Sequence, residues 1–404
     1  MAVNFFVLAI VAFVAVKLTA EYLDVSSYIR PGMCDFLADT LDGGNACYFS
    51  ESYWEARAKF RLLAKLAGAE LTSKEVVAGD FTTDFAVFRG SGDGLVVHSS
   101  GVHGVEGYAG SGIQCAALHE IASATKGKPE LLKGPTIVFI HAVNPYGMAH
   151  FRRFNENNVD LNRNGILPGP EWDELLKRDP NIANYEDFTE LFNPPRPPTL
   201  YDAYIGYFAK ALYNIATFGF VPLKRAIVTG QYHNPKGVYF AGRSQEASHK
   251  VVWDFLEPFA NTKGVITWID VHTGLGPKGV DTLLVETPEE GEDAAKWFED
   301  APALDVTDPT AKGDVAAGYD LSRGFISELY IKRFPVAEAA GRPAMVMGQE
   351  FGTLPGIFVA RAMILENQAF QYDPVNQPYW VSNRFLQGCC MACDGLCVTL
   401  PRCS

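Results

Sequence analysis

The sequence is poor in positive charge and lacks internal repeats. It holds 34 lysine and arginine residues against 47 aspartate and glutamate residues, so its formal net charge is −13. Nucleic acids and anionic membranes attract proteins through a basic surface, so this deficit argues against both kinds of partner. Repeats at solenoid periods and long low-complexity tracts are also missing, and we therefore expect an ordinary globular fold.

A long membrane-spanning run is missing near the N-terminus. The apolar run at residues 5–16 contains 12 residues, which is the length of a signal-peptide core and short of the roughly 20 needed to cross a bilayer. We predict a signal peptide over residues 1–20, cleaved after Ala20, and hence a secreted protein or one in the secretory lumen. The alternative is an uncleaved anchor that attaches the protein to a membrane, the one case in which we expect a lipid partner.

Cysteine is scarce in the middle of the chain and crowded at its end. Of the 8 cysteines, Cys34 and Cys47 lie in an N-terminal extension and five lie in the last 16 residues. In an oxidising compartment this distribution favours disulfide bonds. A structural zinc at Cys390 and Cys393 is the alternative, although no second CxxC pair accompanies it. Cys115 is expected to be a small buried hydrophobe.

Apolar segments of strand length alternate with helical patterns along the chain. Hydrophobic residues make up 48% and charged residues 20% of the sequence, which is ample for a buried core. A helix is predicted at residues 111–125, and such alternation indicates an α/β sheet covered on both faces, with ligands bound beyond the carboxyl ends of the strands. The predicted strands are residues 95–98, 136–140, 226–229, 265–269 and 344–347.

Two short stretches that follow predicted strands supply the ligand types of a catalytic zinc site. The stretch VHGVEG at residues 102–107 contains His103 and Glu106, and IDVHTG at residues 269–274 contains His272. Two histidines and a glutamate leave a fourth zinc position open for water. The His-x-x-Glu pair alone is weak, because composition produces one about once per chain.

Further motifs strengthen this interpretation by their order. NPYG at residues 144–147, NVDLNRN at 158–164 and QEFGT at 349–353 accompany the zinc motifs. Together they resemble the M14 metallocarboxypeptidase superfamily, and most closely its DUF2817 branch. The resemblance covers roughly residues 48 to 370, beginning at YFSESY.

The resemblance implies a three-layer α/β/α fold with a mixed central sheet, zinc-carboxypeptidase-like (phosphorylase/hydrolase-like), that binds one Zn²⁺ ion. We therefore divide the chain into four predicted segments. These are a signal peptide or anchor (1–20), a cysteine-containing extension (21–47), a zinc hydrolase domain (48–385) and a cysteine-rich tail (386–404).

The same resemblance assigns roles around the metal. Glu350 matches the general base, which takes a proton from the zinc-activated water. Arg153 matches the residue that stabilises the developing oxyanion, with Arg152 as a competitor that could equally be an exposed charge. Asn162 and Arg163 match the pair that grips a substrate carboxylate.

Some roles remain open at this point. Asp160 is expected to hold Arg163 or the backbone, and Asp270 either orients His272 or makes a structural hydrogen bond. Among the other histidines, His233 is the candidate for substrate contact. The catalytic tyrosine of the superfamily is not placed, since neither Tyr319 nor Tyr330 lies in a recognisable motif.

These roles predict zinc-dependent hydrolysis of an amide bond next to a free carboxylate, as in a metallocarboxypeptidase acting on peptides. The first alternative is a zinc-dependent deacylase of N-acyl amino acids, because the same metal and arginine set occurs in the aminoacylase-like and desuccinylase-like branches. The second is an inactive zinc-binding module, against which the intact ligand set and Glu350 argue.

Overall fold

The computed structural model describes residues 36, 44–274, 276–285, 288–297, 303–305, 319, 321–341 and 344–382. The predicted signal peptide, Cys34 and the cysteine-rich tail lie outside the described residues, so the expectations for them stay predictions. Within the described residues, no helix combines the length and apolar character needed to cross a membrane.

One eight-stranded mixed sheet organises the molecule, in the order β1-β2-β4-β3-β5-β8-β6-β7. Its centre is parallel, because β3 pairs in parallel with both β4 and β5, and β5 pairs in parallel with β8. The contacts of β2 with β1 and β4, and of β6 with β8, are antiparallel. The strands are β1 (Glu70–Val77), β2 (Phe81–Phe88), β3 (Leu95–Ser100), β4 (Thr136–His141), β5 (Ile266–Gly274), β6 (Asp281–Val285), β7 (Ala303–Asp305) and β8 (Met345–Gly352).

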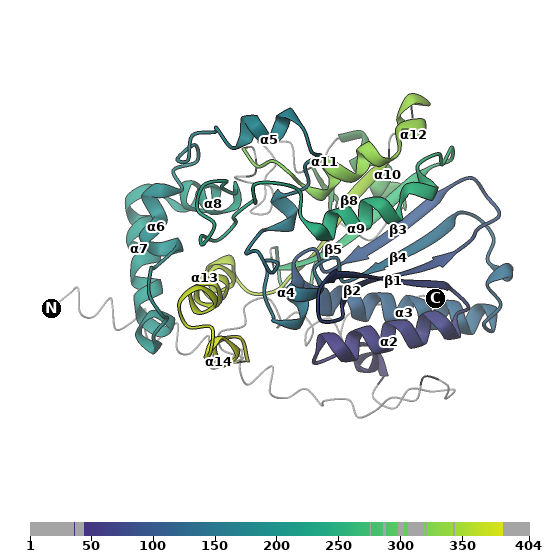
Figure 1. Ribbon diagram of the computed structural model, residues 1–404, viewed down its shortest axis with the longest axis horizontal. Coiled ribbons are helices and arrows are strands. Elements are labelled where there is room, and N and C mark those ends of the chain that lie inside the picture. Colours follow the sequence, from purple (N-terminus) through teal and green to yellow (C-terminus); the bar gives the residue numbers. More distant parts are fainter. Residues whose placement is uncertain are drawn as a thin grey trace.

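Helices cover both faces of this sheet and form a second lobe beside it (Figure 1). The helices are α2 (Tyr53–Leu66), α3 (Gly107–Thr125), α4 (Pro145–Ala149), α5 (Pro170–Leu175), α6 (Thr189–Phe192), α7 (Tyr207–Phe218), α8 (Phe220–Val228), α9 (Ala247–Phe255), α10 (Pro288–Trp297), α11 (Ile326–Tyr330), α12 (Pro335–Ala339), α13 (Gly356–Tyr372) and α14 (Gln377–Ser382). Short 3₁₀ helices are η1 (Gly44–Tyr48), η2 (Gly104–Glu106), η3 (Pro129–Leu131), η4 (Leu161–Arg163), η5 (Glu186–Phe188), η7 (Glu257–Phe259) and η8 (Ile331–Arg333), and η6 (Asp202–Gly206) is a π-helical turn.

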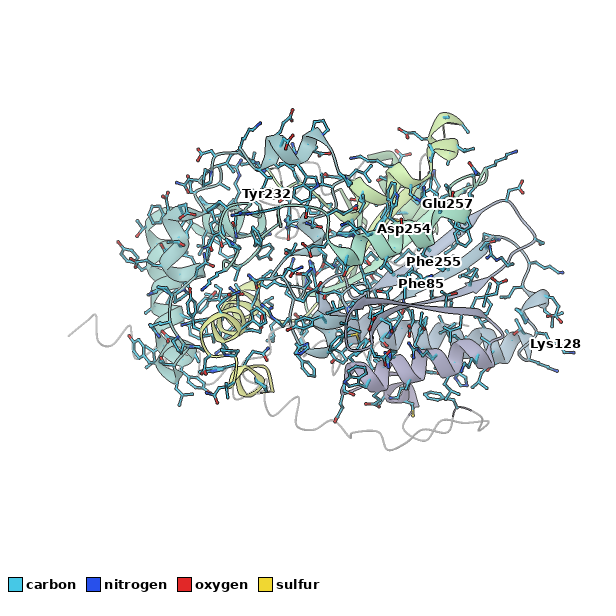
Figure 2. All side chains as sticks on the ribbon, viewed as in Figure 1. Phe85, Lys128, Tyr232, Asp254, Phe255 and Glu257 are labelled. Atoms are coloured by element: carbon cyan, nitrogen blue, oxygen red, sulfur yellow. The ribbon has the colours of Figure 1, made fainter. Side chains whose placement is uncertain are left out.

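The layers follow from where each strand buries its apolar side chains. Helices α2 and α3 pack on one face of the sheet, where Phe60 and Leu118 share a core with Phe139 of β4. Helices α9 and α11 cover the other face, where Figure 2 shows Phe85 of β2 beneath Phe255 of α9, their rings stacked 3.7 Å apart. The predicted three-layer α/β/α fold with a mixed sheet is confirmed.

Most predicted elements are present, with one correction. Residues 226–229, predicted as a strand, form the end of α8. Four apolar residues are too few to separate a strand from a buried helical turn, and here the run belongs to a longer amphipathic helix. Helix α3 begins at Gly107, four residues before its predicted start, and the buried Cys115 within it is a free thiol.

Two fully buried histidines are held neutral by their surroundings. His249 lies 2.8 Å from the carbonyl oxygen of Leu161 and 3.0 Å from the hydroxyl of Tyr330. His141 lies 2.9 Å from the hydroxyl of Ser111 and stacks on Phe60. Burial lowers the pKa of each imidazole from 6.5 to about 4.

These two groups should make the fold sensitive to mild acid. The unfolded chain binds their protons near pH 6.5 and the folded chain only near pH 4, so the free energy of unfolding falls as pH drops through this window. When the pH drops from about 7.5 to 5.5, each histidine should lower the free energy of unfolding by roughly 1.3 kcal/mol. Urea titrations at both pH values should show His249→Gln losing that share of the acid sensitivity, and an unchanged pH dependence would contradict the assignment.

Candidate active site

Three neighbouring parallel strands bring the predicted site residues to one edge of the sheet. His103 follows β3, His272 lies near the end of β5, and Glu350 lies near the end of β8. His272 and Glu350 are direct partners in the β5–β8 register, so their side chains share a face. Both strands run past their predicted ends, which places His272 and Glu350 on strands instead of loops.

The turn that carries His103 and Glu106 depends on glycine in two ways. Gly101 has a φ of +72°, a left-handed conformation that glycine adopts without strain. Gly104 is needed for a close approach, since a Cβ on it would lie 2.1 Å from the carbonyl carbon of Gly147 in α4. The NPYG motif therefore packs closely against the turn that carries His103 and Glu106 and supports it.

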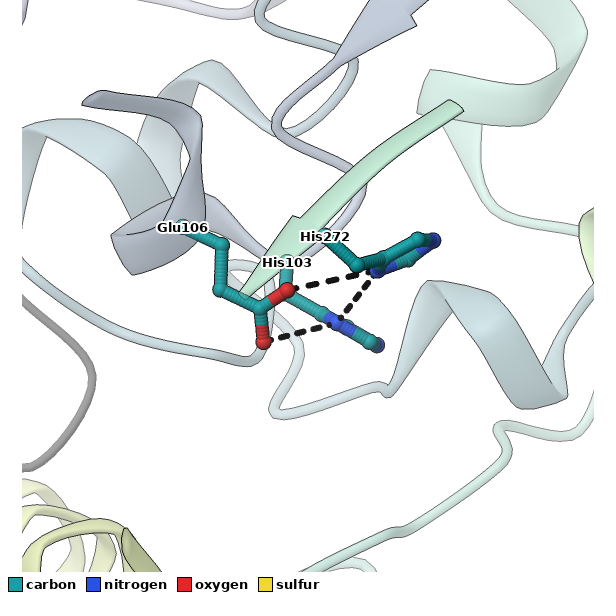
Figure 3. Close-up of side chains that lie close together, drawn as sticks. All are labelled: His103, Glu106 and His272. Atoms are coloured by element: carbon teal, nitrogen blue, oxygen red, sulfur yellow. Dashed lines mark hydrogen bonds and ion pairs between the residues drawn. The ribbon is translucent and has the colours of Figure 1, made fainter. Parts of the chain in front are cut away.

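The three predicted metal ligands meet in the structure (Figure 3). Nδ1 of His103 lies 3.2 Å from Nδ1 of His272 and 3.0 Å from Oε1 of Glu106. Oε2 of Glu106 lies 3.2 Å from Nδ1 of His272 and accepts a hydrogen bond from the amide of Thr273. All three side chains are buried, and among the described residues they form the one group of this kind that can hold a metal ion.

Each histidine also has a carboxylate on its other ring nitrogen. Nε2 of His103 lies 3.2 Å from Asp160, and Nε2 of His272 lies 2.6 Å from Asp270, which in turn accepts a hydrogen bond from Ser99. Such carboxylates orient metal-binding imidazoles and fix which nitrogen faces the metal. The two Nδ1 atoms face each other at nearly the edge length of a zinc tetrahedron, about 3.3 Å. The donor set therefore fits zinc.

The buried charges shift the pKa values of these groups. Burial alone would lower the pKa of His272, but Asp270 and Glu106 outweigh it and hold that pKa well above its ordinary value. Burial would raise the pKa of Glu106, yet His103, His272 and Arg153 lower it strongly. A metal ion must displace the proton on His272, so metal affinity is expected to rise with pH.

The three residues open into a cavity of about 400 Å³. Glu350 lines it beside His272, and Arg153, Asn162 and Arg163 line it as well. The structure thus brings together seven of the eight predicted site residues. Other lining residues include Tyr239, Leu284, Tyr319, Arg323, Phe325, Ile326, Glu328, Met347 and Val359.

Arg153 links Glu106, one of the three candidate metal ligands, to Asp160, which contacts His103. Its Nη1 donates to Oε1 of Glu106 at 3.2 Å and its Nε to Oδ2 of Asp160 at 2.9 Å. The exposed-charge alternative for Arg152 is wrong, because Arg152 is fully buried and donates to Glu366 of α13 at 2.7 Å. Of the two arginines, Arg153 alone lines the cavity.

Arg163 is anchored by backbone carbonyls. Its Nε and Nη2 donate to the Val228 oxygen at 2.8 and 2.5 Å, and its Nη1 donates to the Asn162 oxygen at 2.6 Å. A guanidinium has five N–H groups, so one N–H remains on each terminal nitrogen. The side-chain oxygen of Asn162 accepts a hydrogen bond from the backbone amide of Ile326, which fixes the orientation of the Asn162 side chain.

His233 is the predicted site residue that the structure does not bring to the cavity. It pairs with Glu186 instead, and it is absent from the cavity lining. The local turn directs His233 away from the cavity. The side-chain oxygen of Gln231 accepts hydrogen bonds from the backbone amides of His233 and Asn234 and closes this turn. The predicted substrate contact of His233 is not supported by this position.

Sequence reasoning missed Tyr239 and part of the role of Asp160. Tyr239 lies between two arginines, with its ring centroid 4.5 Å from Cζ of Arg153 and 5.5 Å from that of Arg163. Its φ of +54° is rare for a bulky residue, and such backbone strain is invisible in a sequence. Asp160, expected to hold Arg163 or the backbone, accepts the backbone amide of Asn162, and it also binds Arg153 and His103.

The positions of Tyr319 and Tyr330 bear on which tyrosine could fill the catalytic role that the sequence left open. Tyr319 lines the cavity, and burial raises its pKa well above 10. Tyr330 is enclosed in the core, where its ring stacks on Trp268 at 4.4 Å. Among the described residues, Tyr239 and Tyr319 are therefore the tyrosines that line this cavity and can contact a ligand there.

A family model matches most of the chain. The model of DUF2817, a family described as proteins of unknown function, matches residues 49–384. The chain belongs to the DUF2817 family. No curated protein matches the chain.

Solved structures similar to this DUF2817 member are distant. A succinylglutamate desuccinylase/aspartoacylase homologue from Shewanella frigidimarina is 18% identical, with 75% of this chain and 72% of that chain covered and a TM-score of 0.35. Carboxypeptidase A from Helicoverpa armigera is 12% identical, with coverage of 83% and 73% and a TM-score of 0.43. Murein-tripeptide amidase from Escherichia coli O157 is 14% identical, with coverage of 77% and 96% and a TM-score of 0.35.

The carboxylate behind His272 provides a test of the metal site. Asp270→Asn keeps the shape but removes the charge that orients His272, so zinc affinity should fall about 10- to 100-fold. His272→Ala should lose more, because it removes a ligand. Zinc content and competition with a chromogenic chelator measure both effects. The control Asp281→Asn alters a carboxylate that binds Gln349 outside the cavity, and a loss of equal size there would refute the special role of Asp270.

Proposed function

We propose that this protein is a zinc-dependent hydrolase that cleaves an amide bond next to a free carboxylate, in the manner of a metallocarboxypeptidase. The observation that carries the proposal is the convergence of His103, Glu106 and His272 in a cavity that also holds Arg153 and Glu350. A metal-ligand set, an acid–base carboxylate and a fixed cation in one cavity are the parts that amide hydrolysis requires.

The zinc ion would be held by Nδ1 of His103, Nδ1 of His272 and the carboxylate of Glu106. Bound zinc acts as a Lewis acid and lowers the pKa of water to about 7. Asp160 and Asp270 keep the two imidazoles in the orientation that exposes Nδ1.

Glu350 is the residue proposed to move the proton. Glu350 is the register partner of His272, lines the same cavity and is not among the three residues that can hold a metal, all of which supports this role. It would accept a proton from the attacking water and pass it to the leaving nitrogen. Arg153, held by Glu106 and Asp160, would stabilise the negative charge that develops on the carbonyl oxygen.

Arg163 is the residue proposed to bind the substrate carboxylate. Its two remaining N–H groups, one on each terminal nitrogen, suit two parallel hydrogen bonds. The rings of Tyr239, Tyr319 and Phe325 surround its guanidinium at 4.8 to 5.7 Å and limit its movement. A rigid, partly satisfied arginine recognises a carboxylate at low entropic cost.

Deacylation of N-acyl amino acids is the second candidate. The cavity volume of about 400 Å³ lies near the lower end for small-molecule sites, which favours a compact substrate. A screen of free peptides, C-terminally amidated peptides and N-acyl amino acids distinguishes the two candidates. Turnover confined to N-acyl amino acids would select the deacylase, and stoichiometric zinc without turnover of any amide would favour the inactive binding module.

Glu350→Gln tests the chemical step. Glutamine keeps the shape of the side chain but cannot accept the proton, so kcat should fall by about 10² to 10⁴ while KM changes little. Zinc content should remain stoichiometric, because Glu350 is not a ligand. Steady-state kinetics and elemental analysis provide the readouts, with the exposed Glu257→Gln on η7 as control. Turnover near that of the wild type would remove Glu350 from the mechanism.

Arg163→Lys tests carboxylate recognition. Lysine keeps the charge but loses the paired N–H groups, so KM for substrates with a free carboxylate should rise about 10- to 100-fold. Amidated analogues should be affected little, since they never use the clamp. Arg178→Lys is the matched control, because Arg178 also donates to a backbone carbonyl but lies outside the cavity. Equal penalties for both substrate types would show that Arg163 is only structural.

A further inference from the structure

The lobe beside the sheet carries a concentrated apolar surface. Among the described residues, 17 large hydrophobic side chains are exposed, and nine of them lie between residues 200 and 221. They belong to the end of the preceding loop, η6, α7 and the start of α8, on the side of the molecule away from the sheet (Figure 1). We call this surface the α7 face.

The α7 face includes an apolar stripe along one side of the helical segment. Its exposed members recur every three or four residues, as one side of a helix requires. They are Tyr201, Ile205, Ala209, Leu212 and Ala216. Tyr213 extends the stripe sideways, and Phe220 and Val221 are exposed at the start of α8, after Gly219 turns the chain out of α7.

The opposite side of the same helical segment is also apolar. Ala203 is buried against Leu365 of α13, while Phe208 and Ala211 belong to the core between α7, α8 and α13. A helix that is apolar on both sides is ordinarily covered on both sides. The α7 face therefore has the character of a surface that is buried in an assembly.

Charge distinguishes between the kinds of partner. Residues 200–222 contain two charged residues, Asp202 and Lys210, and Asp202 is paired with Arg196. Helices that lie on bilayers carry many lysines and arginines along their polar side, which this segment lacks. Two copies of a nearly neutral face can meet without opposing like charges, although each chain carries a net charge of −13. Aromatic residues with few charges are typical of the centre of protein interfaces.

The area of the α7 face is sufficient for a stable contact. Its nine large side chains are 38–68% exposed. With about 200 Å² for a large side chain, they present roughly 900 Å² per copy, compared with about 800 Å² per partner in a standard interface.

We infer that a second copy of this chain binds the α7 face, giving a dimer with twofold symmetry in which α7 packs against its counterpart. In such an interface each residue meets the same surface of the partner. One substitution therefore introduces two changes at the contact.

The mass of the full chain in solution tests this inference. Sedimentation velocity from low to high micromolar concentration should show twice the mass of one chain. The Ile205→Glu/Tyr213→Glu variant buries four unpaired charges in the dimer and should weaken association at least about 100-fold. Ala209→Arg, which removes no apolar contact but inserts charge and bulk at the centre, should also give a monomer.

The matched control is Leu62→Glu, which places the same charge on α2 at a residue exposed to a similar extent. It should leave the dimer intact, and circular dichroism should show equal folding in all variants. A wild-type monomer at every concentration would overturn the inference, as would a dimer that survives both α7 variants. A monomer that co-sediments with phosphatidylcholine vesicles through the α7 face would replace the second copy by a bilayer.

Discussion

The parallel pairing of β3 with β5 and of β5 with β8 is the constraint on which the candidate site depends. The pairing aligns the ends of three strands, so that residues far apart in sequence reach one cavity. Because side chains alternate along a strand, a slip of one residue would turn His272 to the opposite face. The register is set by the core behind it, where Trp268 stacks on Tyr330 and donates to Ser99, which holds Asp270. The same core contacts therefore hold the register of β5 and the orientation of the His272 imidazole.

Electrostatics explains why such a cluster is poised for a cation. The carboxylates of Glu106, Asp160 and Asp270 are all buried, and the arginine in direct contact with Glu106 and Asp160 is Arg153. With neutral histidines, three carboxylate charges face this one contacting arginine, and buried unpaired charge is costly. Protonation of His272 relieves part of this excess, which agrees with its raised pKa. A divalent ion would add positive charge among these carboxylates while using the Nδ1 atoms that already face one another.

The sequence was informative where chemistry requires particular residue types. His103, Glu106, His272, Arg153 and Glu350 could be named from motifs. The apolar runs also marked the strands that carry His272 and Glu350 and the strand that precedes His103. The sequence was misleading where the local backbone geometry decides which way a side chain points. His233 looked like a site residue, yet the Gln231 turn directs it to Glu186. For Arg152 the sequence left an exposed charge open, but the structure buries it against Glu366 of α13, while Arg153 reaches the cavity.

Tyr239 shows why part of the site could not be read from the sequence at all. No motif marks it, and a tyrosine at a φ of +54° is unfavourable unless the surrounding structure enforces it. Two backbone hydrogen bonds hold Tyr239 in this conformation. The Tyr239 carbonyl accepts one from the amide of Gln231, and the amide of Ala241 donates one to the carbonyl of Gln231. The strained turn places one aromatic ring against the guanidinium groups of both Arg153 and Arg163, so the ring fixes their spacing. In the proposed function, that spacing separates the oxyanion position from the carboxylate position. The backbone strain would then serve to set the length of substrate that can bridge the two.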